Sequence, residues 1–551
     1  MFALNRRQFI TGCSTGIAVA SMGISRHALA KTQPRQAHYQ AILRGNQFKL
    51  TVNRQDVNFT GKTRQAVTVN GSTPAPTLYM KEGETVTIDV YNQLHEDSSI
   101  HWHGLLVPSN MDGVPHLSFA GIKPQQSFRY QFPLKQSGTY WYHSHSGWQE
   151  QLGMYGALII EPAEGDPIKA DREHVLILSD WTDDNPANIL RFLKSESDFD
   201  NYQQPTFEEL WHDIRQFGLK RAFAKRQMWS QMRMSPTDFS DLSGVTTFTY
   251  LLNGSTSAAN WTALFNRGET VRLRIINASA QSIFDFRIPE LDMTVVGTDG
   301  GLVEPVTVDE VRIGVAETYD VLVNPQADAY TLFAQDIARS GFISGTLAVQ
   351  QGLSAPIPAI DKAEWLTMTD MMGDMQGDEP AHHAHTEYSW TTDMRVDYPR
   401  TNLDDAGVNL RNNGRKVLTY ADLYSFDELR DNEEEPTREI EMHLTGNMER
   451  YVWGFDGVPY SEAKPVHIGV NERLRISLVN DTMMTHPMHL HGMWSDLRCP
   501  NGDLQVRKHT ILVQPAQKVS FDVTGEQGRW AWHCHLAYHM ESGMFREVVV
   551  D

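Results

Sequence analysis

One strand-like pattern occurs three times along this chain, in residues 83–90, 268–275 and 471–478. Apolar and polar residues alternate in each copy, which is typical of a β-strand with one buried and one exposed face. Two landmarks around the second copy, Gly254 and Asn277, recur 203 residues later around the third. A constant offset of that length indicates homologous domains and excludes a solenoid repeat.

The repeat and the composition together predict an all-β fold of three tandem β-sandwich domains. A chain of 551 residues is too long for one core, and 39 Gly and 25 Pro favour turn-rich β architecture over helical bundles. Two segments fall outside the repeat. Residues 183–245 are predicted to be a partly helical insertion, since Thr206 and Glu209 have the form of a helix-capping box. Residues 353–400 form a linker rich in Asp, Met and His.

Four His-x-His units supply eight of the 22 histidines in the chain. They are His101 and His103, His143 and His145, His489 and His491, and His533 and His535. One such unit is weak evidence for a metal, but four of them, the last enclosing Cys534, are hard to obtain by chance. Side chains alternate between the two faces of a strand, so we expect Cys534 to face away from His533 and His535 and to join two metal sites.

The histidine units repeat between the first and third domains, because His143 lies 390 residues before His533. In the middle domain the corresponding strand has Phe333 and Gln335 instead. We therefore predict that the middle domain binds no metal, and that the eight histidines meet where domains one and three are in contact.

The cysteine decides which metal is expected. A thiolate, two histidines and a distant methionine form a blue-copper type of site. The candidate ligands are His486, Cys534, His539 and Met544, with Met540 as the rival methionine. Zinc is the alternative metal. Zinc does not account for eight further histidines linked to a single thiolate strand, whereas redox chemistry does.

With these motifs the sequence resembles the multicopper oxidases of the three-cupredoxin-domain kind, and more narrowly the periplasmic copper-resistance oxidases of Gram-negative bacteria. The likeness runs along the whole chain and includes residues 446–451 (GNMERY) and 480–486 (NDTMMTH). It implies cupredoxin-like Greek-key sandwiches at residues 31–165, 166–352 and 401–551, laccase-like chemistry, and four coppers per chain. The implied ligands are His486, Cys534, His539 and Met544 for type 1, His101 and His489 for type 2, and His103, His143, His145, His491, His533 and His535 for the type 3 pair. Electrons would then pass from type 1 to a trinuclear cluster that reduces dioxygen to two waters.

Asp112 is the candidate proton relay for that reduction. By resemblance it matches an acidic position close to the type 2 copper, whereas local sequence alone favours a turn aspartate before Gly113. Some relatives have an acidic residue directly after the last type 1 histidine. This chain has Met540 there, which leaves no second relay assigned.

Residues 1–30 are predicted to be a twin-arginine export signal. Arg6-Arg7 precede a modest apolar run, and Ala28-Leu29-Ala30 has the form of a cleavage site, so the mature periplasmic chain would begin at Lys31. A membrane anchor is the alternative, but the run is short and interrupted by Gly and Ser, so we expect no stable membrane insertion.

Charge and cysteine content limit the other functions. The net charge of −20 argues against nucleic acid as a partner. Cys13 would leave with the signal, so a disulfide could join only Cys499 and Cys534. Cys534 is better explained as a metal ligand, and no function is expected for Cys499.

The linker raises the question of substrate, because thioethers are soft ligands that favour Cu(I). Its candidate Cu(I) ligands are Met368, Met371, Met372, Met375, His382, His383, His385 and Met394. The alternative is a disordered acidic linker that happens to be rich in methionine. The leading hypothesis is an oxidase that converts Cu(I) to Cu(II), and also oxidises catechols or phenols, with dioxygen as the acceptor. A laccase-type phenol oxidase and a non-catalytic copper-sequestering protein are the alternatives. We expect a monomer, with periplasmic copper-handling proteins as further partners.

Overall fold

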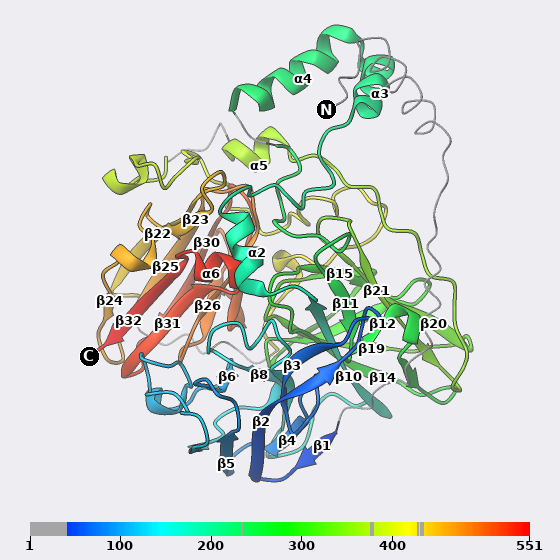
Figure 1. Cartoon of the computed structure of the whole chain (residues 1–551), viewed down its shortest axis with the longest axis vertical. Coiled ribbons are helices and arrows are strands. Elements are labelled where there is room, and N and C mark those ends of the chain that lie inside the picture. Colours follow the sequence, from blue (N-terminus) through cyan, green and yellow to red (C-terminus); the bar gives the residue numbers. More distant parts are fainter. Residues whose placement is uncertain (1–40, 233–234, 375–379, 427–428, 430–434) are drawn as a thin grey trace, which may run out of the picture. The chain divides into compact units, whose positions relative to one another are not determined.

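The computed structural model describes residues 41–232, 235–374, 380–426, 429 and 435–551, in which the strands form six sheets. The predicted signal at residues 1–30 lies outside the described residues. Figure 1 follows the sheets along the chain, from blue through green to red. They fall into three successive sets of two, which confirms the predicted all-β class.

The three copies of the repeated pattern occupy equivalent places in their sheets. They are β5 (Thr85–Asn92), β14 (Val271–Asn277) and β25 (Arg473–Asn480). Each pairs in parallel with an earlier strand, β2, β10 or β22, and antiparallel with a later strand, β7, β19 or β30. A parallel pair requires a crossover connection, so the repeat in sequence is also a repeat in topology.

The second copy departs from the predicted half-exposed strand, because all seven residues of β14 are buried. Its polar face carries Arg272 and Arg274, which pair with Asp320 at 2.5 and 2.9 Å. Arg274 also donates to Thr139 Oγ1 of β8 (Gly138–His143) at 2.8 Å. The first sandwich therefore covers a face that the sequence pattern alone would leave in water.

The first set of sheets packs around its own hydrophobic cluster, drawn from residues 48–160. One sheet contains, in spatial order, β1 (Ile42–Arg44), β4 (Thr77–Lys81), β9 (Tyr155–Glu161), β8 (Gly138–His143) and β6 (His101–His103). The other contains β3 (Arg64–Val69), β2 (Gln47–Val57), β5 and β7 (Ser127–Pro133).

The second set is built in the same way. One sheet contains β12 (Ser255–Thr256), β11 (Thr249–Leu252), β10 (Arg172–Trp181), β14, β19 (Thr318–Val323), β16 (Met293–Thr298) and β17 (Gly301–Val308). The other contains β13 (Thr262–Leu264), β21 (Phe342–Ala348), β20 (Ala329–Asp336), β15 (Phe284–Arg287) and β18 (Glu310–Ile313).

The third set contains the cysteine. One sheet contains β23 (Val452–Phe455), β22 (Arg438–Asn447), β25, β30 (Lys518–Thr524), β27 (Ser495–Arg498) and β28 (Leu504–Lys508). The other contains β24 (Val466–Ile468), β32 (Phe545–Val550), β31 (Gly528–Cys534), β26 (His486–Leu490) and β29 (Thr510–Val513).

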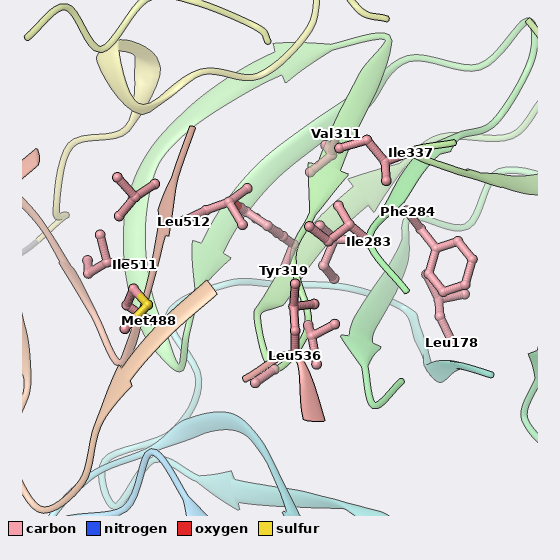
Figure 2. Close-up of a cluster of buried hydrophobic side chains, with 14 of the residues drawn as sticks. Leu178, Ile283, Phe284, Val311, Tyr319, Ile337, Met488, Ile511, Leu512 and Leu536 are labelled. Carbon is pink, nitrogen blue, oxygen red and sulfur yellow. The ribbon is translucent and has the colours of Figure 1, made fainter. Parts of the chain in front are cut away.

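The second and third sets share one hydrophobic cluster. Figure 2 shows Leu512 from the third set beside Tyr319 from the second. Burying an aliphatic or aromatic side chain contributes about 1.5–3 kcal/mol. A continuous apolar contact of this kind holds the two sets in one fixed arrangement.

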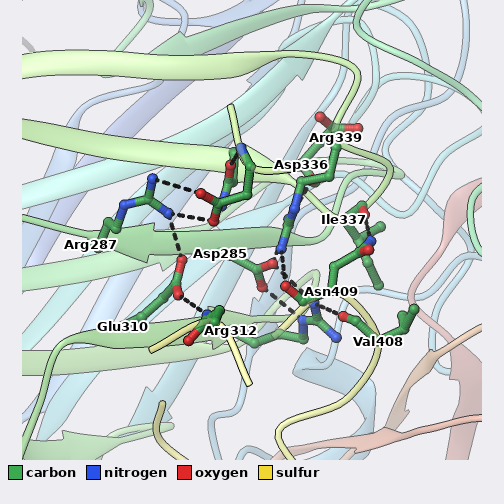
Figure 3. A network of polar contacts seen from close by, with 12 residues as sticks. Asp285, Arg287, Glu310, Arg312, Asp336, Ile337, Arg339, Val408 and Asn409 are labelled. Carbon is green, nitrogen blue, oxygen red and sulfur yellow. Dashed lines mark hydrogen bonds and ion pairs between the residues drawn. The ribbon is translucent and has the colours of Figure 1, made fainter. Parts of the chain in front are cut away.

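Buried arginines of the second set donate hydrogen bonds to the segment before β22 (Figure 3). Asp285 accepts from Arg312 at 2.8 Å and from Arg339 at 2.6 Å, and both arginines are buried. Each arginine also donates to a backbone carbonyl of this segment, Arg312 to Val408 and Arg339 to Asn409. The buried charges are thus paired and hydrogen-bonded, as burial requires.

The helices lie mostly in the predicted insertion. It contains α2 (Pro186–Leu193), α3 (Phe207–Phe217) and α4 (Leu219–Met232), while α5 (Met368–Met372) and α6 (Ala537–Glu541) lie elsewhere. The capping box is confirmed, since Thr206 and Glu209 each accept from the backbone N–H of the other. Among the described residues, none of the helices has the length and apolar content needed to cross a bilayer.

Candidate metal centre

Two pairs of neighbouring strands carry the His-x-His units. Antiparallel pairing of β6 with β8 places His101 opposite His143, and pairing of β26 with β31 places His489 opposite His533. Directly opposed residues have their Cβ atoms about 4.5–5.5 Å apart. The sheet register therefore brings the rings together before any contact between sandwiches is made.

The two strand pairs face each other, and their eight histidines form one group, named here the histidine cluster. His101 stacks on His491 with ring centroids 3.9 Å apart, and His103 stacks on His489 at 3.8 Å. Candidate ligand nitrogens gather in three triplets, each within 4.8 Å. The triplets are His101, His103 and His489; His103, His143 and His535; and His145, His491 and His533. The structure thus brings together all eight histidines singled out in the sequence.

Burial favours the neutral form of seven imidazoles in this cluster. Loss of solvation, reinforced by neighbouring imidazoles, lowers the pKa of His103, His143, His145, His489, His491 and His535 well below the usual value. Burial likewise lowers the pKa of His533 to about 4. Neutral imidazoles keep a free lone pair, which is the form that binds metal.

A second group, named here the cysteine site, lies on the other side of the same strand. His486 begins β26, Cys534 ends β31 and His539 lies in α6. Cys534 Sγ is 3.5 Å from His486 Nδ1 and 3.9 Å from His539 Nδ1, and the two nitrogens are 3.2 Å apart. All three residues are fully buried. His533 and His535, the residues on either side of Cys534, belong to the histidine cluster. Cys534 therefore connects the two groups through the backbone.

Hydrogen bonds fix the tautomers in the cysteine site. Thr482 Oγ1 donates to Asn480 Oδ1, so it accepts from His486 Nε2, at 2.7 Å. The Asp241 carboxylate can only accept, and it lies 2.8 Å from His539 Nε2. Both Nε2 atoms therefore carry the proton, and both Nδ1 lone pairs point towards Cys534. Burial raises the pKa of the Cys534 thiol, so ionisation requires a cation beside it.

The two candidate methionines lie in different surroundings. Met544 is fully buried, and its backbone N–H donates to the His539 carbonyl at 3.0 Å while its carbonyl accepts from Cys534 N–H at 3.1 Å. Gly543, with φ of +119°, provides the turn before it. Met540 is only half-buried and lines a cavity. These contacts favour Met544 as the methionine of the cysteine site.

Asp112 joins two histidines of the histidine cluster. Its Oδ2 lies 2.9 Å from His491 Nδ1, its Oδ1 lies 3.3 Å from His101 Nδ1, and its backbone carbonyl accepts from the same His101 nitrogen at 2.8 Å. The turn is set by Gly113, where a Cβ would lie 1.8 Å from the Ile100 carbonyl oxygen. Asp112 is therefore a turn residue before glycine, as local sequence predicts, and also a buried partner of the cluster.

A second carboxyl group, which the sequence did not indicate, contacts the cluster. Glu150 Oε2 lies 2.6 Å from His143 Nδ1, and Glu150 Oε1 lies 3.9 Å from His535 Nδ1. Burial, with Asp180 adding to it, raises the pKa of Glu150 well above the usual value. Glu150 lines a cavity of about 580 Å³ together with His145, His533 and His535. A carboxyl group whose burial favours the protonated form thus lies between this cavity and the cluster.

Comparison with known proteins identifies this combination of sites. Multicopper oxidase family models match residues 51–165, 172–351 and 433–551. The chain belongs to the multicopper oxidase family. It is 49% identical to copper resistance protein A from Escherichia coli and 46% identical to copper resistance protein A from Pseudomonas syringae pv. tomato, with 99% of each chain covered in both cases.

Solved multicopper oxidases share the fold. The crystal structure of Fet3p, a multicopper oxidase that functions in iron import, has a TM-score of 0.64 at 20% identity, covering 92% of this chain and 90% of that one. A laccase from Botrytis aclada has a TM-score of 0.61 at 18% identity, covering 93% and 88%. The predicted fold of three tandem cupredoxin-like Greek-key sandwiches with a partly helical insertion is confirmed.

A multicopper oxidase holds four coppers, one of type 1, one of type 2 and two of type 3. The nitrogens of the histidine cluster fit such ions. His101, His143, His489, His491 and His533 each direct Nδ1 at an oxygen that can only accept, so Nδ1 carries the proton. The Nε2 lone pairs of His491 and His533 then face each other 3.1 Å apart, which is repulsive without a cation between them.

Other cluster nitrogens are left without partners in the same way. Within the described part of the chain, five buried nitrogens have no hydrogen bond: His101 Nε2, His103 Nδ1, His143 Nε2, His489 Nε2 and His535 Nε2. Buried polar atoms are rarely left unsatisfied, and metal ligands are a standard reason. The residues present therefore fit the copper ions that the family implies.

Three functional neighbours escaped the sequence reasoning. Asp241 comes from the helical insertion, Glu150 follows the second His-x-His unit, and His509 gives its carbonyl to His489 Nδ1 at 2.6 Å. Asp241 and His509 lie in no repeated motif, so no local pattern marked them. Glu150 lies in residues 143–154, which match residues 533–544 at the 390-residue offset, but its counterpart there is Met540, so the repeat did not mark it either. The only sequence signal was the proximity of Glu150 to His143 and His145 along the chain.

The candidate Cu(I) ligands of the linker do not share one environment. Met371 and Met394 are buried in the hydrophobic core, whereas Met368 and Met372 of α5 are exposed. His382 and His385 are exposed, and Met375 lies outside the described residues. His383 lies next to carboxylates instead. Cu(I) binding by this set stays a prediction.

The middle sandwich uses its equivalent positions for packing. Phe333 of β20 is fully buried in the sheet. Gln335 exchanges hydrogen bonds with Asp361, its Nε2 donating at 2.6 Å and its Oε1 accepting from the backbone N–H at 2.9 Å. Absence of metal from this sandwich stays a prediction.

Proposed function

We propose that this copper-dependent oxidase works in periplasmic copper resistance, converting Cu(I) to Cu(II) and reducing dioxygen to water. The observation that carries the proposal is the position of Cys534, between a buried two-histidine site and a buried eight-histidine cluster. Similarity along the whole chain to two proteins named copper resistance protein A supports the biological role.

The ligand assignment follows the triplets and the tautomers. We assign His486, Cys534, His539 and Met544 to type 1, and His101 and His489 to type 2. The type 3 pair takes two triplets, His103, His143 and His535, and His145, His491 and His533. His103 uses Nδ1, because its Nε2 faces Thr510 Oγ1 at 3.2 Å, and the other cluster histidines with fixed tautomers use Nε2.

When bound, the coppers supply one-electron acceptance at the cysteine site and four-electron reduction of dioxygen at the histidine cluster. The chain supplies the connection, because only the backbone of β31 separates Cys534 Sγ from the rings of His533 and His535. It also excludes water from the cysteine site, where Trp453 stacks on His539 with ring centroids 3.8 Å apart. A dry site with ligands already in place costs little reorganisation when an electron arrives.

Two carboxyl groups can handle protons for the reduction. Asp112 accepts from His101 and His491, and so orients one type 2 ligand and one type 3 ligand. Glu150 lines the cavity 2.6 Å from His143 Nδ1, and its burial favours the protonated form, so it can hold a proton there. It compensates for Met540, which occupies the place where some relatives have an acidic residue. We propose Asp112 and Glu150 as the two proton-handling residues.

The remaining predictions complete the proposal. Residues 1–30 direct export through the twin-arginine pathway, and the mature chain is a periplasmic monomer. The domains are residues 31–165, 166–352 and 401–551, with the linker at residues 353–400. Partners are dioxygen, Cu(I), phenolic substrates and periplasmic copper-handling proteins. The absence of a described helix able to span a bilayer is compatible with this location.

Oxygen uptake with two reductants tests the function. We expect the copper-loaded protein to consume oxygen with Cu(I) and more slowly with a substituted phenol. A laccase-type enzyme would prefer the phenol, and a sequestering protein would consume oxygen with neither.

Replacing both exposed methionines of α5, Met368 and Met372, by Leu tests whether this helix delivers Cu(I) to the cysteine site. Cuprous turnover should fall several-fold while phenol turnover stays constant, and equal losses would remove that role from α5.

We expect Asp241→Asn to raise the reduction potential of the type 1 copper. The carboxylate accepts from His539 Nε2–H and makes Nδ1 a stronger donor, which favours Cu(II) over Cu(I). An amide oxygen is a weaker acceptor. A tenfold change in the preference of the site for Cu(II) over Cu(I) corresponds to about 59 mV for one electron. Redox titration of the blue absorption measures the shift, with exposed Asp184→Asn as the control. An unchanged potential would show that Asp241 does not set the reduction potential of this copper.

A further inference from the structure

A third cluster of metal-ligating side chains lies outside the histidine cluster and the cysteine site. It consists of His383, Glu387, His443 and Asp481, and is named here the mixed cluster. His383 and Glu387 come from the linker, around the 3-10 turn His385–Tyr388. His443 lies in β22, and Asp481 directly follows β25, the strand paired with β22. Glu387, His443 and Asp481 are at most 1% exposed, and the His383 side chain is 5% exposed.

Two imidazole nitrogens and two carboxylate oxygens converge in the mixed cluster. Glu387 Oε2 lies 2.7 Å from His383 Nδ1 and 3.5 Å from His443 Nδ1. Asp481 Oδ2 lies 2.8 Å from His443 Nδ1 and 3.7 Å from His383 Nδ1. Ligands bound tetrahedrally at about 2.0–2.2 Å lie about 3.3–3.6 Å from one another. Of the four nitrogen–oxygen separations, two are shorter than this range, one lies within it and one is slightly longer. Small shifts would therefore complete a four-ligand shell.

Each carboxylate of the mixed cluster is held so that one of its oxygens faces the centre, the point at which the four ligand atoms converge. Glu387 Oε1 accepts from the backbone N–H of Ala384 at 2.7 Å, which leaves Oε2 for the histidines. Asp481 Oδ1 accepts from the backbone N–H of Val396 at 2.8 Å, which leaves Oδ2. A liganding group anchored through its second oxygen is the outer-shell arrangement found in metal sites.

The outer nitrogens of both histidines also face carboxylates. His383 Nε2 lies 3.4 Å from Asp397 Oδ1, and His443 Nε2 lies 3.5 Å from Glu441 Oε1. Neither nitrogen makes a hydrogen bond at normal distance within the described residues. A proton on Nε2 facing a carboxylate orients the ring so that Nδ1 is presented to a metal. For each histidine, the imidazole ring thus lies between an outer carboxylate and the shared centre of the mixed cluster.

Protonation would otherwise have to balance the cluster. If no cation is present, each Nδ1 must donate to the nearby carboxylate of Glu387 or Asp481, while each Nε2 faces a second carboxylate. Burial alone would lower the pKa of His443, but its hydrogen bond to Asp481 and the nearby carboxylates of Glu441 and Glu387 raise it to about 10. A divalent cation would replace these protons and neutralise the two buried carboxylates.

We propose that the mixed cluster binds one divalent cation of intermediate softness through His383 Nδ1, His443 Nδ1, Glu387 Oε2 and Asp481 Oδ2. Among such ions, a site with two nitrogens and two oxygens binds Cu(II) more tightly than Zn(II), and it offers no sulfur to Cu(I). The site is additional to the four coppers. It does not depend on the proposed oxidase function, because none of its residues is among the assigned copper ligands.

The test uses the protein with its full complement of four coppers. Isothermal titration with Zn²⁺ in two buffers of different ionisation enthalpy should show one further equivalent bound, with release of at least one proton. Titration with Cu²⁺ should add one nitrogen-coordinated copper to the spin-resonance spectrum, above the type 1 and type 2 signals. His383→Gln and Asp481→Asn should each weaken binding by about tenfold or more.

The linker also provides a matched control. His385 begins the 3-10 turn two residues after His383 but is exposed, so His385→Gln should bind the extra ion as the unchanged protein does. No further equivalent in the unchanged protein, or equal affinity in His383→Gln and Asp481→Asn, would overturn the proposal. Oxygen uptake by the same samples keeps the two claims apart. Loss of the extra ion with full turnover affects only this site, and absence of turnover with the extra ion bound affects only the proposed function.

Discussion

Cys534→Ser is expected to lose the blue colour and the oxidase activity together. The thiolate is the ligand that gives a blue-copper site its character, and a serine hydroxyl neither ionises at neutral pH nor offers sulfur to Cu(I). The histidine cluster makes no use of the sulfur atom, so its three coppers should remain. We therefore expect the copper content to fall from about four to about three per chain, with activity at the background rate.

The chain supplies the matched control for this substitution. Cys499 is the other cysteine among the described residues, and it is half-buried with its Sγ donating to the Asp503 carbonyl at 3.3 Å. Cys499→Ser should keep the colour, the four coppers and full turnover. Turnover at the unchanged rate by Cys534→Ser would show that electrons reach the histidine cluster by a route that avoids β31.

The strand register explains why so much of this centre could be predicted. Alternation along β31 dictates that Cys534 faces away from His533 and His535, and the offset of 390 residues between His143 and His533 marks β8 and β31 as equivalent strands of the first and third domains. Alternation and repetition are properties of the sequence itself, so they can be read from a single chain. The same reasoning gave the capping box at Thr206, which depends on residues only three positions apart.

Contacts between distant segments could not be predicted in this way. Asp241 reaches His539 across 298 positions of sequence, and its neighbourhood reads as an ordinary surface insertion. The polar face of β14 likewise reads as exposed, although Thr139 and the first sandwich cover it. The linker shows the same limit. Its richness in methionine suggested soft ligands throughout, whereas the fold buries Met371 in the core and turns His383 towards Glu387.

Asp112→Asn is expected to slow the reduction of dioxygen by about 10–100-fold, the range seen when an outer-shell partner of a metal site is removed. The carboxylate lies beside two N–H donors, His101 Nδ1 and His491 Nδ1. An amide has one accepting oxygen and one donating nitrogen. With its oxygen at His491 Nδ1, the amide nitrogen would face His101 Nδ1–H, which the backbone carbonyl of residue 112 still accepts, and the negative charge beside both rings would be lost. Substrate oxidation at the cysteine site should be unaffected, because Asp112 makes no contact there.

Rapid mixing separates the two half-reactions of Asp112→Asn. Under anaerobic conditions the blue absorption should bleach with Cu(I) at the unchanged rate, and on mixing with dioxygen it should return slowly. The pair of Asp89 with Arg129 in the same sandwich provides the control, since Asp89→Asn removes a carboxylate from β5, which lies in the other sheet from the histidine strands β6 and β8. Slow bleaching of the blue absorption, followed by its return at the normal rate, would show that Asp112 acts in electron acceptance at the cysteine site instead. Normal rates in both steps, with four coppers bound, would show that one oxygen atom suffices to hold both rings, and that the charge of Asp112 is not needed to deliver protons to the cluster.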